Sequence, residues 1–258
     1  MGILNLTPDS FYEGSRIRGT AALLRQAETM LQEGAAILDI GGYSSRPEAT
    51  DITAEEERIR VIPAIRAVRQ AFPDCIISVD TFRAVIAEEA IAAGAHIIND
   101  ISGGQLDGMM FETVGRLQVP YILMHMRGTP QTMSQLTQYE DIMAELVRYF
   151  EPRIMQLQAA GVRDIILDPG FGFAKTIDQN FDVLRHLGDL KLLGLPILAG
   201  LSRKSMTYKT LEVPATEALA GTIALNTIAL MHGASILRVH DVKEAVQTIK
   251  LFKKSITP

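Results

Sequence analysis

The chain has 258 residues, of which 47% are hydrophobic and 21% are charged, and its formal net charge is −5 at pH 7. This composition is typical of a globular protein with a well-filled core. The acidic balance excludes a general nucleic-acid-binding protein, whose surface is normally basic, but it does not exclude a local anion pocket. Cys75 is the single cysteine, which excludes an intrachain disulfide and a zinc site built from cysteines.

No segment has the pattern of a signal peptide or a membrane span. Residues 1–14 lack a basic start followed by an apolar run. The most apolar stretch, Ala218–Met231, contains Thr222, Asn226 and Thr227 and is too short and too polar to span a bilayer. We interpret it as a buried helix and expect a soluble, cytoplasmic protein.

Short β-branched runs alternate with longer helical patterns along the whole chain. Apolar residues recur at three- and four-residue spacing in Ala21–Glu33, Glu55–Ala71 and Ile142–Ala160, which predicts amphipathic helices. Thr53 followed by Glu56 predicts a capping box at the start of the second helix. The predicted strands are Gly2–Leu6, Ala36–Ile40, Cys75–Asp80, His96–Ile101, Tyr121–Met126, Asp164–Asp168, Pro196–Leu201 and Ile236–His240.

Glycines stand between several predicted helices and the strands that follow them. Glycine can adopt the left-handed conformation that ends a helix, and we expect this of Gly34, Gly94, Gly161 and Gly233. Alternating strands and helices imply parallel strands joined by right-handed crossovers. Eight such units without a change of composition predict an α/β fold with one domain over residues 1–258. We expect a (β/α)8 TIM barrel rather than an open, doubly wound sheet.

Most predicted strands end in a polar side chain. In a TIM barrel the carboxyl ends of the strands carry the active site. Any one of these residues is as readily a helix cap or a loop anchor, but eight polar ends on one rim favour a shared site. They are Asn5, Asp39, Asp80, Asn99–Asp100, His125, Asp168, Ser202–Lys204, and Arg238 with His240.

The predicted rim offers two kinds of chemistry. Hydrogen-bonding groups suited to a flat heterocycle with an amide edge and an exocyclic amine are Asp80, Asn99, Asp168 and Lys204. Positive groups suited to phosphate or carboxylate are Arg46, Arg203, Arg238 and His240. Asn5 and the acidic groups suit Mg²⁺, which prefers oxygen ligands.

The glycine-rich run Pro169–Lys175 matches neither the G-x-G-x-x-G fingerprint nor the P-loop. A nucleotide-binding function is therefore unsupported. We expect Gly170 and Gly172 to let this loop fold over a ligand, with Phe171 or Phe173 as a wall.

Two further features suggest a site that the pattern does not support. His125 and His240 lack a third nitrogen or sulfur ligand in the pattern, which argues against a metal pair. The acidic run Glu55–Glu57 is expected to be a solvated first helical turn, where the helix dipole favours negative charge.

The rim segments resemble the signatures of the dihydropteroate synthase family over essentially the whole chain. In chain order these segments are Met1–Phe11, Asp39–Pro47, Ser78–Thr81, Ile98–Ile101, Met124–Met126, Leu167–Lys175, Ser202–Ser205 and Arg238–Asp241. Together they are very specific, because other pterin-binding barrels share the fold and a few acidic residues but not this set. The chain starts inside the first signature, so we expect Met1 to be an alternative or shortened start.

Some positions depart from the family's commonest residues. Tyr43 stands where the family usually has Glu, Ser45 where it usually has Thr, and Ala174 where it usually has Gly. Glu48 stands where the family frequently has Gly. Ser45 retains a hydroxyl, so its role is expected to be retained.

The resemblance implies a transferase of folate biosynthesis. Its reaction would condense (7,8-dihydropterin-6-yl)methyl diphosphate with 4-aminobenzoate, giving 7,8-dihydropteroate and diphosphate by an SN1-like mechanism. It also implies Mg²⁺ as a cofactor, a homodimer, and sulfonamides as inhibitors.

The resemblance also implies a role for individual residues. The pterin would be bound by Asp80, Asn99, Asp168 and Lys204. The diphosphate would be bound by Asn5, Arg46, Arg238 and His240, with Asn5 also binding Mg²⁺. The 4-aminobenzoate would be bound by Ser45, Arg46, Phe173, Lys204 and Ser205. Catalysis would rest on Asp80, Asp168, Lys204 and Arg238.

Two other functions remain as alternatives. A methyltetrahydrofolate-dependent methyltransferase is also a pterin-binding barrel, but it has no use for Arg238 and His240 as a diphosphate pair. A non-catalytic pterin-binding module predicts the loss of chemically important rim groups, and these are retained.

Overall fold

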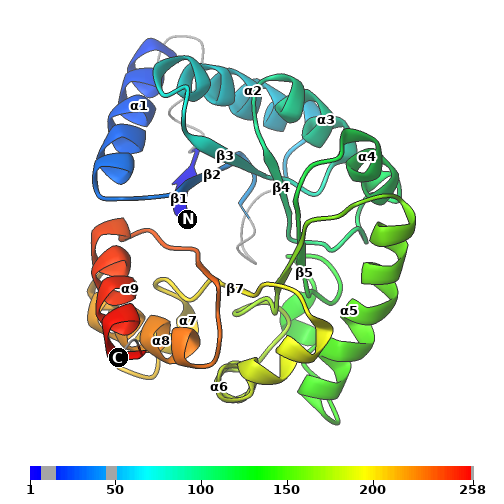
Figure 1. The fold of residues 1–258 in the computed structure, drawn as a ribbon, viewed down its shortest axis with the longest axis vertical. Coiled ribbons are helices and arrows are strands. Elements are labelled where there is room, and N and C mark those ends of the chain that lie inside the picture. The colour runs from blue at the N-terminus through cyan, green and yellow to red at the C-terminus, as the bar shows by residue number, and fades with distance from the viewer. Residues whose placement is uncertain (7–15, 45–50, 257–258) are drawn as a thin grey trace.

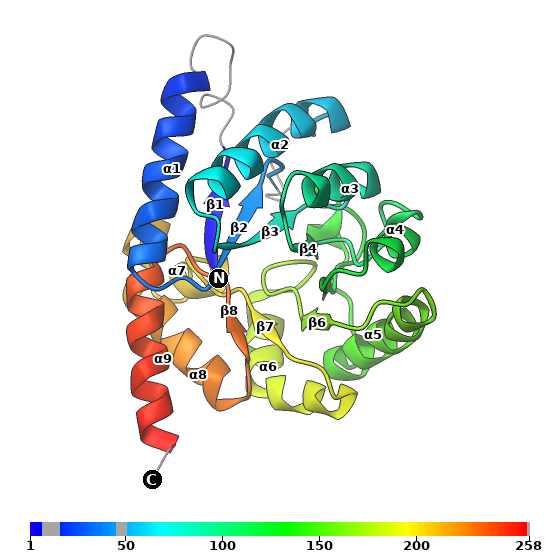
Figure 2. The same cartoon turned by 45° about the horizontal axis from the view of Figure 1, so that its top comes forward.

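The computed structural model describes residues 1–6, 16–44 and 51–256, in which helices surround a central ring of strands (Figures 1 and 2). The strands are β1 (Gly2–Asn5), β2 (Ile37–Gly41), β3 (Ile76–Asp80), β4 (Ile97–Asp100), β5 (Tyr121–Met124), β6 (Ile165–Asp168), β7 (Leu198–Ala199) and β8 (Ile236–Leu237). The α-helices are α1 (Arg16–Gln32), α2 (Ala54–Ala71), α3 (Ala84–Ala92), α4 (Met110–Leu117), α5 (Ile142–Ala159), α6 (Ile177–Arg185), α7 (Ser205–Tyr208), α8 (Leu219–Met231) and α9 (Val242–Ile256). Short 3₁₀ helices are η2 (Met133–Gln135), η3 (Leu187–Leu193) and η4 (Ala215–Glu217).

Parallel pairing closes the strands into a ring. β1 to β6 form one sheet in chain order, and β7 pairs with β8. The two sheets meet through Leu167 and Ile197 on one side and through Gly2 and Val239 on the other. At the second junction the Ile3 N–H donates to the Val239 carbonyl at 2.9 Å. The predicted (β/α)8 TIM barrel is confirmed.

The seventh and eighth strands are shorter than predicted. β7 ends at Ala199 rather than Leu201, and β8 ends at Leu237 rather than His240. The His240 N–H donates to the hydroxyl of Ser202 at 3.2 Å instead of continuing the backbone ladder. A side-chain acceptor therefore ends the regular pairing.

Local signals at the helix ends behave as the sequence predicts. The Glu56 N–H donates to the Thr53 hydroxyl at 3.2 Å and the Thr53 N–H donates to the Glu56 carboxylate at 2.8 Å, which completes the capping box of α2. The glycines expected to end helices have positive φ: 101° at Gly34, 110° at Gly94, 93° at Gly161 and 97° at Gly233.

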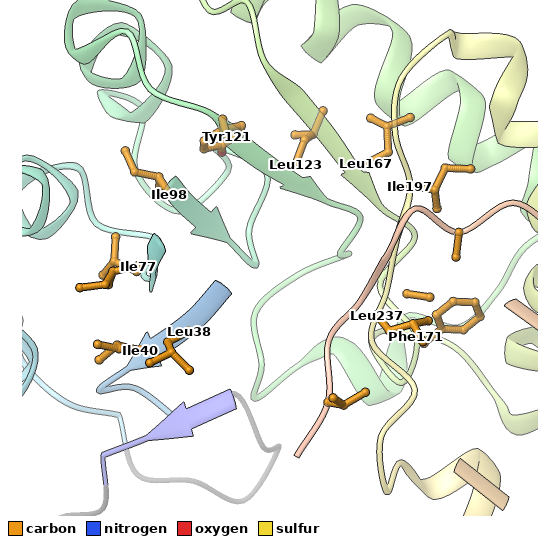
Figure 3. Close-up of a cluster of buried hydrophobic side chains, with 14 of the residues drawn as sticks. Leu38, Ile40, Ile77, Ile98, Tyr121, Leu123, Leu167, Phe171, Ile197 and Leu237 are labelled. Carbon is orange, nitrogen blue, oxygen red and sulfur yellow. The ribbon is translucent and has the colours of Figure 1, made fainter. Parts of the chain in front are cut away.

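Side-chain alternation along the strands separates two apolar layers. One face of the strands packs against the helices, and its buried residues include Leu38, Ile77, Ile98, Leu123 and Leu167 (Figure 3). The opposite face fills the interior of the barrel with Ile37, Ile97, Ile122, Ile166, Leu198 and Ile236.

The barrel interior becomes polar one step nearer the carboxyl ends of the strands. Two positions after an interior isoleucine, the next inward residue is Asp39 on β2, Asn99 on β4 and Asp168 on β6, and it is Arg238 directly after β8. The pairing shifts by one residue from each strand to the next, as in other eight-stranded barrels. Inward residues from alternate strands therefore form one layer across the barrel. These four polar residues therefore lie at one height above an apolar floor.

The acidic run at the start of α2 is not wholly solvated, and the prediction for Glu57 was wrong. Glu55 is exposed, whereas Glu57 is fully buried and forms an ion pair with Arg83. Burial raises the pKa of Glu57, and its bond to Arg83 opposes that shift. The helical period explains the burial, because Glu57 lies one turn before the buried Val61.

Helix α8 is only partly buried, contrary to the prediction for Ala218–Met231. Leu225 and Leu230 face the core, but Ile228 is 38% exposed and Met231 is 70% exposed. A helix on the outside of a barrel buries one face only, so its apolar outer face must remain in solvent or meet a partner. None of the described helices combines the length and the apolar character that crossing a membrane requires.

We predict that Glu57→Ala destabilises the fold by about 3 kcal/mol, because it leaves the buried end of Arg83 without its carboxylate. Chemical denaturation measures the loss. The matched control is Glu55→Ala, two residues earlier on the exposed face, which should leave the unfolding midpoint unchanged. Equal midpoints for the two variants would show that the buried ion pair does not stabilise the fold.

Candidate active site

The guanidinium of Arg238 joins two carboxylates in the mouth of the barrel. Its Nε donates to Asp39 at 2.6 Å and its Nη2 donates to Asp80 at 2.7 Å. The Asn99 amide donates to the same oxygen of Asp39 at 3.0 Å. Side chains from β2, β3 and β4 are thus connected to the residue that follows β8, and Asp39 lies at the centre of the network.

Burial and neighbouring charges shift the pKa values of Asp80 and Arg238 by different amounts. Burial raises the pKa of Asp80 to about 7, the neighbouring carboxylates of Asp39 and Glu57 add to that shift, and Arg238 opposes it. Burial lowers the pKa of Arg238, but Asp39 and Asp80 outweigh it and raise that pKa above its ordinary value. Arg238 therefore stays charged, while Asp80 can change its protonation state near neutral pH.

Lys204 lies on the other side of the mouth, next to Asp168. Its ammonium donates to the Phe171 carbonyl and lies 4.8 Å from the centre of the Phe173 ring. Burial lowers the pKa of Lys204 to about 8, against the attraction of Asp168. Burial also raises the pKa of Asp168, and Lys204 opposes this. The two groups partly compensate each other in a poorly solvated site.

The loop between β6 and α6 is held close to the strand ends. The Gly170 N–H donates to the Asp168 carboxylate at 2.8 Å, and the Gly172 N–H donates to the side-chain oxygen of Asn180 at 2.7 Å. A Cβ at Gly170 would lie 2.1 Å from the His125 carbonyl oxygen, so the approach requires glycine. The glycine-rich run is thus held against the ends of β5 and β6, and its folding over a ligand stays a prediction.

An apolar wall stands beside the polar layer. Its members come from the segments after β3, β4 and β6 and from the end of β5 and the segment that follows it. Phe82 and Phe173 are partly buried against a buried set of Ile101, Met124, Met126, Met133 and Ala174. Such a wall can cover the faces of a flat ring while the polar layer forms hydrogen bonds with its edge.

At the rim of β7 and β8, one arginine does not have the role that the sequence predicts. Arg203 is a loop anchor rather than a free positive charge, because its Nε and Nη2 donate to the Asp241 carboxylate at 2.9 and 2.8 Å. Its Nη1 also donates to the Thr216 carbonyl at 2.8 Å. His240 lies at the same rim, with its Nδ1 2.9 Å from the Ser202 hydroxyl oxygen.

Two strand-end residues turn away from the mouth. Asp100 follows Asn99 and faces the opposite side of β4, where it accepts a bond from the Tyr121 hydroxyl at 2.6 Å. His125 is fully buried, and its Nδ1 lies 2.9 Å from the ammonium nitrogen of Lys175. These contacts make both residues structural anchors.

The remaining predicted site residues lie at the rim or outside the described residues. Asn5 ends β1 with an exposed side chain, beside Gly41 of β2. Ser205 begins α7 directly after Lys204. Ser45 and Arg46 lie outside the described residues.

Comparisons with known proteins agree with this geometry. Residues 1–240 match the family described as "Pterin binding enzyme". A curated relative, the dihydropteroate synthase of Escherichia coli K12, is 42% identical over 259 aligned positions that cover 100% of this chain and 91% of the relative. The chain belongs to the dihydropteroate synthase family.

Solved structures of this family have the same fold. The Yersinia pestis dihydropteroate synthase in complex with a sulfonamide drug is 42% identical, with a TM-score of 0.91 over 99% of this chain and 92% of that one. The Xanthomonas albilineans dihydropteroate synthase with 4-aminobenzoic acid is 38% identical, with a TM-score of 0.91 over 100% of this chain and 93% of that one.

Two residues have contacts in or beside the site that the sequence pattern does not reveal. Asp39 is predicted only as one of the acidic rim groups that suit Mg²⁺, although its alternation with the buried Leu38 and Ile40 shows that it faces inward. Lys175 was treated only as the end of the glycine-rich run, yet it is 9% exposed and belongs to the packed interior of the loop.

We predict that Asp39→Asn moves the titration of Asp80 to lower pH than its value of about 7, because the Asp39 charge is one of the causes that raise it. Carboxyl ¹³C chemical shifts measure the titration, with the resonance assigned by its loss in Asp80→Asn. Asp178→Asn, at an exposed position on α6, should leave it unchanged. An Asp80 that titrates at its ordinary value in the parent protein would contradict the described electrostatics.

Proposed function

We propose that this chain is a dihydropteroate synthase that transfers the pterin-6-ylmethyl group from its diphosphate ester to 4-aminobenzoate. The observation that carries the proposal is the inward polar layer of Asp39, Asn99, Asp168 and Arg238 in the barrel mouth. The family relationship supports it, as does the 4-aminobenzoic acid bound to the Xanthomonas albilineans relative.

The pterin ring would occupy the space between the polar layer and the apolar wall. Asp80 and Asp168 accept hydrogen bonds from ring N–H groups and the exocyclic amine, and Lys204 donates to ring acceptors. Asn99 can both donate and accept at the amide edge. Asn99 and Asp168 lie on strands, which fixes their positions more precisely than a loop would.

The diphosphate would lie beside Arg238 and His240 at the rim, with Asn5 and Arg46 as further contacts. A guanidinium carries five N–H donors, and the bonds of Arg238 to Asp39 and Asp80 leave capacity for phosphate oxygens. The positive charge of Arg238 stabilises the charge that grows on the departing diphosphate.

Departure of the diphosphate before attack would leave a cationic pterin methylene. Ionised Asp80 offsets this positive charge, and the arylamine then forms the new C–N bond and releases a proton. The second substrate would lie against Phe173, Lys204 and Ser205, with Ser45 and Arg46. No side-chain nucleophile is required for this SN1-like sequence.

Magnesium fits this site as a partner of the bound diphosphate. The described residues contain no group of three His, Cys, Asp or Glu side chains that could hold a metal alone. Asn5 offers an exposed amide oxygen at the end of β1, and Mg²⁺ commonly combines few protein oxygens with waters and substrate phosphates. When bound, the cation would neutralise charge on the leaving group.

We predict diphosphate release that requires both substrates and Mg²⁺, and that falls by about 100-fold or more in Lys204→Ala and in Asp80→Ala. A coupled assay for released diphosphate measures it. Lys209→Ala, on the exposed turn after α7, is the matched control and should retain full activity. Pterin binding without turnover would favour a binding module, and methyl transfer from methyltetrahydrofolate to a corrinoid would favour a methyltransferase.

We also propose a homodimer formed through the outer face of α8 and α9. Met231 on α8 is 70% exposed and Leu251 on α9 is 74% exposed. These helices lie side by side (Figures 1 and 2). Apolar exposure on adjacent helices is typical of an interface.

Sedimentation should therefore give twice the mass of the 28.3 kDa chain, and Met231→Glu should give the monomer mass. Met155→Glu, at a 65% exposed methionine on α5, should leave the dimer intact. A parent protein that sediments as a monomer would rule out this interface.

A further inference from the structure

Lys175 makes contacts that fully satisfy a buried ammonium. Its Nζ lies 2.9 Å from His125 Nδ1, 3.0 Å from the Gly170 carbonyl oxygen and 3.1 Å from the Phe173 carbonyl oxygen. An ammonium carries three hydrogens and no acceptor, so each hydrogen has one partner. Burying a charged lysine is unfavourable unless it is paired in this way, so the arrangement indicates a specific role.

The loop that Lys175 binds has a conformation that requires support. Gly170 has φ 68° and Gly172 has φ 79°. Ala174, where the family usually has glycine, has φ 47°, which is unfavourable for a residue with a Cβ. The Lys175 ammonium bonds to two carbonyls within this loop, and the Tyr139 hydroxyl donates to a third, that of Ala174, at 2.8 Å.

His125 connects the same loop to the barrel. The ammonium of Lys175 can only donate, so Nδ1 of His125 must accept, and the neutral ring carries its proton on Nε2. Burial and the charge of Lys175 hold the pKa of His125 well below its ordinary value. The ring packs edge-on against Tyr149 with 4.7 Å between centroids, and the Tyr149 hydroxyl donates to the Met124 carbonyl at 3.0 Å.

The supported loop presents two groups to Lys204. The Phe171 carbonyl accepts from its ammonium, and the Phe173 ring lies beneath that ammonium. Asn99 and Asp168, in contrast, lie on strands and do not depend on the loop for their position. A change in the loop should therefore alter the Phe173 side of the site more than the pterin edge.

We propose that Lys175 and His125 are positioning residues that fix the β6–α6 loop, and with it the Phe173 wall and Lys204, for binding of the arylamine substrate. Neither residue needs to contact a substrate. The proposal rests on the proposed function, because the arylamine is the second substrate of that reaction.

The kinetic test uses Lys175→Met, which keeps the length of the side chain and removes its three donors. Burial lowers the pKa of Lys175 to about 7, with Asp168 opposing, so the assays are run below pH 7, where the ammonium predominates. We expect KM for 4-aminobenzoate to rise about tenfold or more, as for loss of a charged hydrogen bond. The dissociation constant of 6-hydroxymethylpterin, measured by fluorescence, should rise less than about threefold, because only Lys204 among its proposed contacts depends on the loop, whereas Asp80, Asn99 and Asp168 lie on strands.

Variants of His125 provide a second test if Lys175→Met fails to fold. His125→Leu removes the acceptor and should raise the same KM. His125→Asn places an amide oxygen near Nδ1 and should restore most of the affinity. Lys243→Met, on the exposed surface of α9, is the control. A merely structural role would lower kcat through loss of folded protein and leave KM unchanged, and that result would overturn the proposal.

A measurement that needs no activity separates this proposal from the proposed function. Hydrogen–deuterium exchange should be faster in residues 169–175 of Lys175→Met, with strands β2 to β5 unchanged. Histidine ¹⁵N shifts should show the Nε2–H tautomer of His125 in the parent protein. Absence of product with the parent protein would reject the proposed function alone. Unchanged exchange in the loop would reject the positioning role.

Discussion

One partly buried arginine shared between two carboxylates organises the mouth of this barrel. Arg238 binds Asp39 and Asp80, residues separated from it by 199 and 158 positions in the chain. Removing three charges from water is unfavourable unless their geometry is well defined, and a closed ring of strands provides that geometry. The apolar floor of isoleucines beneath the layer excludes water from below and strengthens every interaction above it. The fold and the chemistry therefore depend on the same inward-facing positions.

Some groups of the site lie on strands and others lie on or depend on loops. The acidic and amide groups on β2, β3, β4 and β6 belong to the hydrogen-bonded ring, so they form a fixed surface for an aromatic edge. The aromatic wall and the Lys204 ammonium depend on the β6–α6 loop, which lacks such a ladder and relies on buried side chains. The first substrate therefore meets a surface that is mostly on strands and shares Lys204 with the second, whereas the aromatic wall for the second lies on the loop, which is consistent with ordered assembly of an active site.

Much of the fold could be predicted from periodicity, because strands, helices and end-capping residues are local features of the sequence. Pairings over long sequence distances could not. The partner of Asp39 directly follows the last strand, and only the register of a closed barrel brings Arg238 to it. The sequence predicts Arg203 as a phosphate ligand because it shows the charge of the side chain. It does not show that the guanidinium forms two hydrogen bonds with the Asp241 carboxylate. Glu57 was predicted to be solvated because it follows two exposed glutamates, but it lies on the side of α2 that faces the core.

The positions at which the heterocycle and its leaving group bind decide whether this barrel mouth is the active site. A crystal structure with the pterin diphosphate and Mg²⁺ would test it. We predict the ring against Asn99, Asp168 and Lys204, with Asp80 close to the methylene carbon and the diphosphate on Arg238. A ring bound away from the layer formed by Asp39, Asn99, Asp168 and Arg238, or a diphosphate remote from Arg238, would contradict the account.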